Sequence, residues 1–273
     1  MIAERIRLCL LTALREMLRA GRMRSLPPIA ACPLCFVLLA AGCAHQQVPV
    51  LDSARQSALS VQPNPAPPKR ADFKQEHKSE NARQVADWVV DSGDNCQMPF
   101  AVVDKVDAKA FVFDADGQLR GAAPVLVGLA RGDDSIPGIG NRNLSDIRAE
   151  ERTTPAGRFV AALGFNFNGK DVLWVDYEGA VALHRVVTNN PKERRLQRLA
   201  SSKPLDHRIS YGCINVPAEY FNNVVSPTFK GTYGIVYVLP DTRPIKEIFN
   251  SYYDVELERQ SRREALPRTT VSQ

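Results

Sequence analysis

Residues 207–216 read HRISYGCINV. Cys213 stands between a glycine and an apolar residue, with a serine three residues before it and an asparagine two residues after it. Gly212 permits a sharp turn, and the amides of Gly212 and Cys213 can face a developing oxyanion. Pro217 is typical of a helix start, and the first amides of a helix favour a nearby thiolate. The pattern indicates either a nucleophilic thiol or a buried small side chain.

A thiol at neutral pH needs a base or a positive field to become the nucleophilic thiolate. His184 follows an apolar run at residues 180–183, so we expect it at a strand end, pointing out of the core. His207 precedes Cys213 in the loop that leads to it. Either histidine can supply the base, and either can instead be structural.

The composition excludes some classes of function. The chain has 273 residues, 44% of them hydrophobic, and a net charge of +5. Most of that charge is concentrated in residues 1–42, which are rich in arginine, so the charge gives no support for nucleic-acid binding. No spacing of cysteine, histidine or carboxylate residues predicts a metal or another cofactor.

The first residues read as a secretory signal peptide, residues 1–42. A basic stretch precedes an apolar run at residues 29–41, which is too short to span a bilayer comfortably. The end of this run, LAAGC, resembles a bacterial lipobox, in which Cys43 would be lipidated. We therefore expect a periplasmic lipoprotein anchored to a membrane. The alternative is an ordinary cleaved signal and a soluble secreted protein.

The domain boundaries follow composition. Residues 44–80 are proline-rich and polar, which predicts a disordered linker. Residues 81–98 begin with weak helical spacing and predict a short helical lead-in. Residues 99–240 form the expected catalytic domain, and residues 241–273 are expected to be a polar C-terminal tail.

Residues 99–240 alternate short apolar runs with tight turns, which predicts a mainly β domain, either a sandwich or an irregular barrel. A long polar loop at residues 131–156 interrupts the strands and is expected to be functional or disordered. Helices are expected at residues 192–201 and 217–224. The expected strands are residues 100–103, 110–113, 119–127, 158–166, 172–175, 180–183 and 232–239.

Four stretches, in this order, carry a resemblance to the L,D-transpeptidase family. They are AFVFDADGQL at residues 110–119, TPAGRF at 154–159, the Leu183-His184 pair and SYGCIN at 210–215. The resemblance covers about residues 99–240. It implies a β-sandwich of mixed sheets with a few short helices, and a cysteine acyltransferase of peptidoglycan that acts in cell-wall assembly and cell shape.

The resemblance also implies roles for residues. Cys213 is the nucleophile and His184 the proton donor and acceptor, whereas His207 matches no motif position. Gly212 and Asn215 shape the site, and the substrate is expected to contact Arg208, Ser210 and Tyr211.

Three features depart from the family pattern. Arg185 stands where glycine or serine is frequent, and Tyr211 replaces a frequent histidine. The stretch between His184 and Cys213 is longer than in compact members, and its charged residues are expected to form a lid.

The implied reaction is attack of Cys213 on the L-centre carbonyl of diaminopimelate in a tetrapeptide stem, with release of D-alanine. The acyl group would pass to an amine on another stem or on a wall-attached protein. Water as acceptor would make the protein a carboxypeptidase or hydrolase, and a non-catalytic wall-binding lipoprotein is a third reading. Because a disulfide would silence Cys213, we expect Cys96 to be free.

Overall fold

The computed structural model describes residues 69–264, and the signal segment, Cys43 and most of the linker lie outside them. The linker expected at residues 44–80 extends too far. Asp72 forms a β-bridge with Gln118, and the buried Phe73 ring makes edge contacts with Phe111 and Phe113. The fold therefore begins about ten residues before the expected boundary.

The lead-in forms a helix, α2 (Glu80–Ser92). The Ser79 hydroxyl accepts a hydrogen bond from the Ala82 amide, which caps the first turn. Gly93 ends the helix in the left-handed conformation, with φ of 70°. The buried face of α2 includes Val85, Trp88 and Val89, as the helical spacing predicts.

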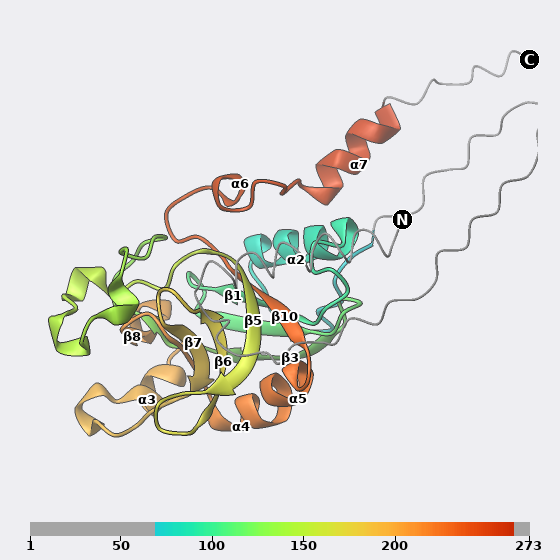
Figure 1. Cartoon of the computed structure of the whole chain (residues 1–273). Helices are drawn as coiled ribbons and strands as arrows, with labels where there is room; N and C mark the ends of the chain where they lie inside the picture. The colour runs from blue at the N-terminus through green and yellow to red at the C-terminus, as the bar shows by residue number, and fades with distance from the viewer. Residues whose placement is uncertain (1–68, 265–273) are drawn as a thin grey trace, which may run out of the picture. The chain divides into compact units, whose positions relative to one another are not determined.

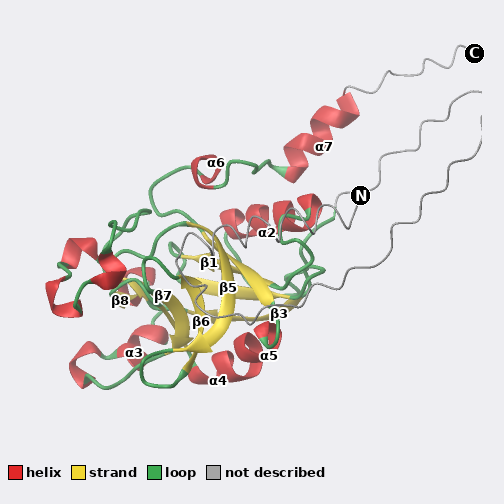
Figure 2. Ribbon diagram, viewed as in Figure 1, coloured by secondary structure: helices red, strands yellow, loops and turns green. Residues whose placement is uncertain are grey.

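One mixed sheet dominates the described residues (Figures 1 and 2). Its strands are β1 (Phe100–Asp104), β2 (Lys109–Phe113), β3 (Leu119–Pro124), β5 (Gly157–Phe165), β6 (Asp171–Asp176), β7 (Val181–Arg185), β9 (Ile214–Val216) and β10 (Tyr233–Val238). Their order is β3-β2-β1-β10-β5-β6-β7-β9. A second, two-stranded sheet pairs β4 (Val127–Gly128) with β8 (Arg208–Ser210) in parallel.

The sheet separates two apolar clusters because its strands alternate their side chains between the two faces. One cluster joins residues of β1, β2, β6, β7, β9 and β10 to the helical stretch after Pro217. Strands from the two ends of the sheet can share one cluster only if the sheet curves around it. The other cluster lies under α2 and includes Trp88, Tyr237 and Phe249. A mainly β fold with a large mixed sheet and short helices is confirmed.

Some boundaries differ from the expected ones. The run at residues 119–127 is split: β3 ends at Pro124, and Val127 pairs in the other sheet. The helix after Pro217 is longer than expected and continues through α4 (Ala218–Tyr220), a π-helix (Phe221–Val225) and α5 (Ser226–Phe229).

The expected polar tail is also partly wrong. The Asp241 carboxylate is fully buried, and after α6 (Ile245–Ile248) the buried Phe249 packs on Trp88. The last described helix, α7 (Val255–Glu264), contacts α2. None of the helices within residues 69–264 is long and apolar enough to cross a membrane.

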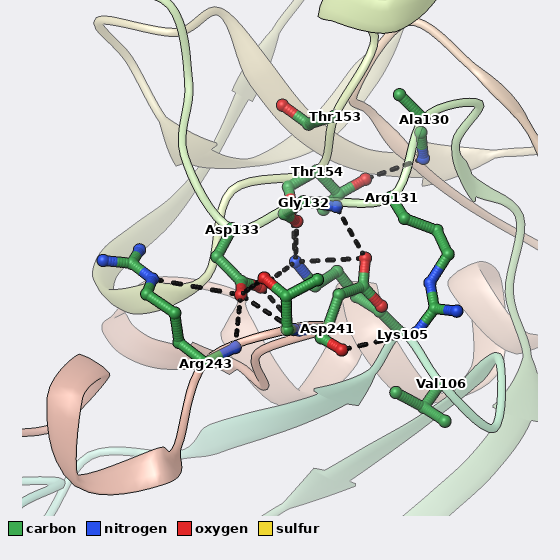
Figure 3. Close-up of polar contacts among 12 residues, drawn as sticks. Lys105, Val106, Ala130, Arg131, Gly132, Asp133, Thr153, Thr154, Asp241 and Arg243 are labelled. Carbon is green, nitrogen blue, oxygen red and sulfur yellow. Dashed lines mark hydrogen bonds and ion pairs between the residues drawn. The ribbon is translucent and has the colours of Figure 1, made fainter.

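The polar loop (residues 131–156) is ordered and contains three short 3₁₀ turns. A buried cluster of charges fastens its first residues to the end of β10 (Figure 3). The Lys105 ammonium donates to the Asp133 carboxylate at 3.0 Å and to the carbonyls of Gly132 and Thr154. Asp133 also accepts hydrogen bonds from the Thr242 and Arg243 amides. We call the three residues Lys105, Asp133 and Asp241, whose charged side chains are buried, the buried charge cluster.

The charged segment (residues 186–207) connects β7 to β8. It contains a 3₁₀ turn (Pro191–Glu193), the short helix α3 (Arg195–Leu199) and a second 3₁₀ turn (Pro204–His207). In Figure 1 the helical turns of the polar loop and α3 both lie on the left of the molecule, near β8.

Candidate active site

The Tyr-Gly-Cys turn lies between two short strands that the sequence did not reveal, β8 and β9. Ser210 closes the turn. Its hydroxyl donates to the Cys213 carbonyl at 2.6 Å and accepts from the Gly212 amide at 3.1 Å. Ser210 is only 2% exposed, so its contacts favour shaping the turn over binding substrate.

The polar loop holds the same turn from the other side. The Thr154 hydroxyl donates to the Gly212 carbonyl and accepts from the Gly128 amide, both at 2.8 Å. Gly212 has φ of 133°, and a Cβ there would lie 2.8 Å from the Thr153 carbonyl oxygen. The motif at residues 154–159 thus places Thr154 where it fixes the backbone before Cys213.

Tyr211 is held by the same loop. The Arg152 guanidinium carbon lies 4.0 Å from the centre of the Tyr211 ring, a cation–π contact. Arg152 in turn donates to the Ile147 carbonyl. One face of the Tyr211 ring is therefore covered by the protein, which restricts any contact with substrate to the rest of the side chain.

The thiol of Cys213 is free and partly accessible. Its Sγ lies 3.8 Å from the Ala180 carbonyl oxygen, which places it against the turn before β7. Burial raises the pKa of Cys213, while a hydrogen bond with the Ala182 backbone and the positive charge of Arg195 act in the opposite direction. The resting group is thus a protonated thiol, and attack requires removal of its proton.

The structure corrects two expectations: that a helix terminus stabilises the thiolate, and that the Gly212 amide faces a developing oxyanion. The three residues of β9 and Pro217 separate Cys213 from the helix that begins at Ala218, and an extended strand of three residues alone covers about 10 Å. The helix terminus is too distant for its dipole, which acts within one turn. The Gly212 amide already donates to Ser210, so it is not a free oxyanion donor.

The pairing of β7 with β9 brings His184 to the face of Cys213. Leu183 pairs with Ile214 and His184 with Asn215, and both Leu183 and Ile214 belong to the buried cluster. Since side chains alternate across a strand, His184 and the residues on either side of Ile214 point to the opposite face. By this alternation Cys213, directly before β9, and His184 are expected on the same side of the β7–β9 pair.

His184 has the features of a base. Its Nδ1 lies 2.7 Å from the Arg185 carbonyl oxygen, a contact that requires a proton on Nδ1 and leaves Nε2 as the acceptor in the neutral ring. Burial lowers the pKa of His184, so the ring is neutral at rest.

The substitution of glycine or serine by Arg185 does not disturb this contact, because the carbonyl belongs to the backbone. The Arg185 side chain turns away and binds Asp171 and Asn222.

Two predicted site residues remain, Asn215 and Arg208, and their contacts differ. Asn215 is 1% exposed, and its amide nitrogen donates to the Cys213 carbonyl at 3.2 Å, which agrees with a site-shaping role. Arg208 is 8% exposed, and its guanidinium binds the Asp241 carboxylate at 2.6 Å and the Lys105 carbonyl at 3.2 Å. These contacts attach β8 to the buried charge cluster and give Arg208 a structural task away from substrate.

His207 is 3% exposed and is enclosed by backbone. Its Nδ1 lies 2.9 Å from the Val125 carbonyl oxygen and its Nε2 3.0 Å from the Ser201 carbonyl oxygen. Both ring nitrogens therefore face acceptors, which leaves neither for a proton from Cys213.

The sequence did not single out Arg195, which the structure brings to the site from α3. Its Nη1 donates to the Asn215 side-chain oxygen at 2.8 Å, and its Nε to the Glu193 carboxylate at 2.5 Å. The only signal was its place in a charged stretch, which does not distinguish it from Arg194 or Arg198.

Cys96 differs from expectation. It is disulfide-bonded, whereas Cys213 is free, so these two cysteines are not joined. The expectation that Cys96 carries a free thiol is wrong, but the Cys213 thiol is not blocked.

The comparisons with known proteins give structural neighbours only. No protein-family model matches the chain, and no curated protein matches its sequence. Solved structures that match include the helical cell shape determining protein Pgp2 from Campylobacter jejuni, with 16% identity and a TM-score of 0.32. The match covers 54% of this chain and 49% of Pgp2, so the chain spans about half of that protein.

Two further matches are L,D-transpeptidases. The catalytic domain of the Enterococcus faecium enzyme has 18% identity and a TM-score of 0.30, and the match covers 52% of this chain and 98% of that domain. The enzyme from Xylanimonas cellulosilytica has 16% identity and a TM-score of 0.31, with coverage of 52% and 60%.

Proposed function

We propose that the protein is a peptidoglycan L,D-transpeptidase in which Cys213 is the nucleophile and His184 the base. The observation that supports the proposal is the pairing of β7 with β9, because β7 carries the tautomer-fixed His184 and the free thiol of Cys213 directly precedes β9. The match of four stretches to the family's motifs in sequence order supports the same reading.

In the first half-reaction His184 takes the thiol proton, and the sulfur attacks the L-centre carbonyl carbon of diaminopimelate in a tetrapeptide stem. The oxyanion collapses, the bond to D-alanine breaks, and His184 gives the proton to the leaving amine. The products are a thioester on Cys213 and free D-alanine.

In the second half-reaction an amine of another stem, or of a wall-attached protein, attacks the thioester. His184 takes the amine proton and returns it to the sulfur, which regenerates the thiol. Water in place of the amine gives the carboxypeptidase or hydrolase reaction. The same two residues serve both outcomes, so the acceptor decides which one occurs.

Localisation is part of the proposal. The basic and apolar segments before Cys43 and the lipobox-like sequence LAAGC support a periplasmic protein held to a membrane by lipid on Cys43. Metabolic labelling with a fatty acid tests this: the full chain is expected to incorporate label, and Cys43→Ala is expected to incorporate none.

Incubation with tetrapeptide-bearing muropeptides tests the reaction. Crosslinked dimers are expected in addition to free D-alanine, whereas tripeptides alone would assign the carboxypeptidase. Cys213→Ala is expected to abolish turnover and covalent capture of a carbapenem, with thermal unfolding showing that the variant is folded. Acylation of Cys213→Ala at the rate of the unchanged protein would exclude Cys213 as the nucleophile.

A further inference from the structure

The guanidinium of Arg195 lies one side chain away from the catalytic turn. It donates to Asn215 at 2.8 Å, and Asn215 donates to the carbonyl of Cys213 at 3.2 Å. Asn215 is also the register partner of His184 across β7 and β9. Arg195 therefore reaches the Cys213 backbone through one buried amide, and that amide belongs to the residue beside His184 in the strand pair.

The Arg195 guanidinium forms hydrogen bonds with the protein through only some of its donors. Glu193 binds its Nε and Asn215 one hydrogen of its Nη1, and the Arg195 side chain is 12% exposed. Within residues 69–264 no hydrogen-bond partner is present at Nη2. A guanidinium has five N–H groups in a planar fork that matches a carboxylate, so this side chain has donors left for a second carboxylate.

The nearby groups make the place suitable for an anion. The positive charge of Arg195 acts at both Cys213 and His184, and burial keeps those two groups neutral at rest. Glu193 demonstrates that a carboxylate fits against this guanidinium. It is carried by the exposed 3₁₀ turn before α3, with its own side chain 27% exposed.

We propose that Arg195 binds the terminal carboxylate of the donor peptide, and so selects stems whose scissile bond joins the last residue. This rests on the proposed function. In a tetrapeptide stem the terminal carboxylate is three bonds from the scissile carbonyl carbon, within the residue that leaves. A pentapeptide moves the carboxylate one residue further along the chain. An arginine beside the catalytic turn can therefore distinguish the two donors by the position of one negative charge.

The test compares two donors that differ only in that charge: a disaccharide-tetrapeptide with a free C-terminal carboxylate, and the same compound with a C-terminal amide. The rates measured are formation of the thioester on Cys213, by mass spectrometry, and release of alanine or alaninamide. The unchanged protein is expected to prefer the free acid by about tenfold or more in kcat/KM, as for a charge-assisted hydrogen bond.

Arg195→Met is expected to lose this preference by slowing only the free acid, and Arg195→Lys to retain part of it. Lys192→Ala is the matched control, since Lys192 is an exposed cation in the same charged segment. It is expected to keep both rates.

The outcomes separate the inference from the function beneath it. Equal slowing of both donors by Arg195→Met would overturn the inference and leave Arg195 acting only through Asn215 on the catalytic pair. An undiminished preference for the free acid in Arg195→Met would overturn it as well. If the unchanged protein forms no thioester with either donor, the proposed function fails and the inference with it.

Discussion

The polar loop (residues 131–156) and the charged segment (residues 186–207) both border the Tyr-Gly-Cys turn, but they are held differently. The polar loop is fastened by buried charges, with Lys105 and Asp133 side chains at 0% and 1% exposure. The charged segment has mostly exposed side chains, and Leu199 and His207 are its buried ones. The first therefore fixes the backbone of the site, whereas the second brings Arg195 to it from a more exposed support.

The difference shows that two long connections, both rich in polar residues, can differ in rigidity according to whether their charges are buried or exposed. Buried charges constrain geometry because each must keep its partners, since an unpaired buried charge costs several kcal/mol. Exposed ion pairs contribute little and exchange partners readily. The expected lid role of the charged segment stays a prediction, and the hydrogen bond from Arg195 to Asn215 of β9 is a contact that would have to open.

The largest effect is expected from two histidines, His184 in β7 just before the charged segment and His207 at the end of that segment. His184→Ala is expected to slow carbapenem acylation by about 10²- to 10⁴-fold, the usual contribution of a general base. His207→Ala is expected to lose much less activity per folded molecule, because its ring nitrogens face the Val125 and Ser201 carbonyls. The reverse ranking would transfer the base to His207.

Removing the Lys105 ammonium from the buried charge cluster tests whether this cluster holds the polar loop in place. Lys105→Met removes the buried cation of Asp133, while Asp241 keeps its ion pair with Arg208. Because Asp133 then lacks its buried cation, we expect a loss of about 3–5 kcal/mol in the free energy of unfolding. Urea denaturation measures it, with Lys170→Met at an exposed position as control. A loss no greater than in the control would mean that the cluster does not anchor the polar loop.

A smaller effect is expected at the link between the polar loop and the Tyr-Gly-Cys turn. Thr154→Val keeps the shape but leaves the Gly128 amide and the Gly212 carbonyl without a partner, at a cost of about 1–3 kcal/mol. Acylation of Cys213 is expected to slow because its backbone is less constrained. Thr153→Val removes only an exposed hydrogen bond to the Asp134 carbonyl and is expected to change neither quantity. Equal effects at the two positions would contradict the link.

The smallest effect is expected from pH. Burial lowers the pKa of His184 from its usual 6.5 and raises that of Cys213 from its usual 9.0. Between those limits both groups are neutral, and the fraction with the proton transferred from sulfur to nitrogen does not change with pH. The acylation rate is therefore expected to fall as the pH drops below 6.5 and His184 becomes protonated. It is expected to stay nearly flat from there to about pH 9, and to change again only above pH 9.

Arg195→Met sharpens the pH prediction. The positive charge of Arg195 lowers the pKa of both His184 and Cys213. Its removal is expected to move both limbs of the pH profile to higher pH. A profile that keeps its position would mean that Arg195 has no electrostatic contact with the pair.

Local patterns predicted much of the fold because strand alternation and turn residues act over a few positions. The strands near residues 100–103, 110–113 and 172–175 were found within one or two residues. The short strands β8 and β9 were missed, since three residues carry too little periodicity. The burial of Asp241 was missed for a related reason: a charged residue in a polar stretch reads as exposed unless its distant partners are known.

The sequence by itself determined the mainly β class and the candidate nucleophile, Cys213, because these rest on residue types and local order. The preference for His184 over His207 as the candidate base came from the resemblance to the L,D-transpeptidase motifs. Only the tertiary structure decided that Ser210 and Thr154 hold the turn, that Arg208 binds Asp241, and that Arg195 reaches Asn215. Each of those contacts depends on where a donor meets an acceptor in space. Except within the turn that Ser210 closes, the partners lie 20 or more positions apart in the chain.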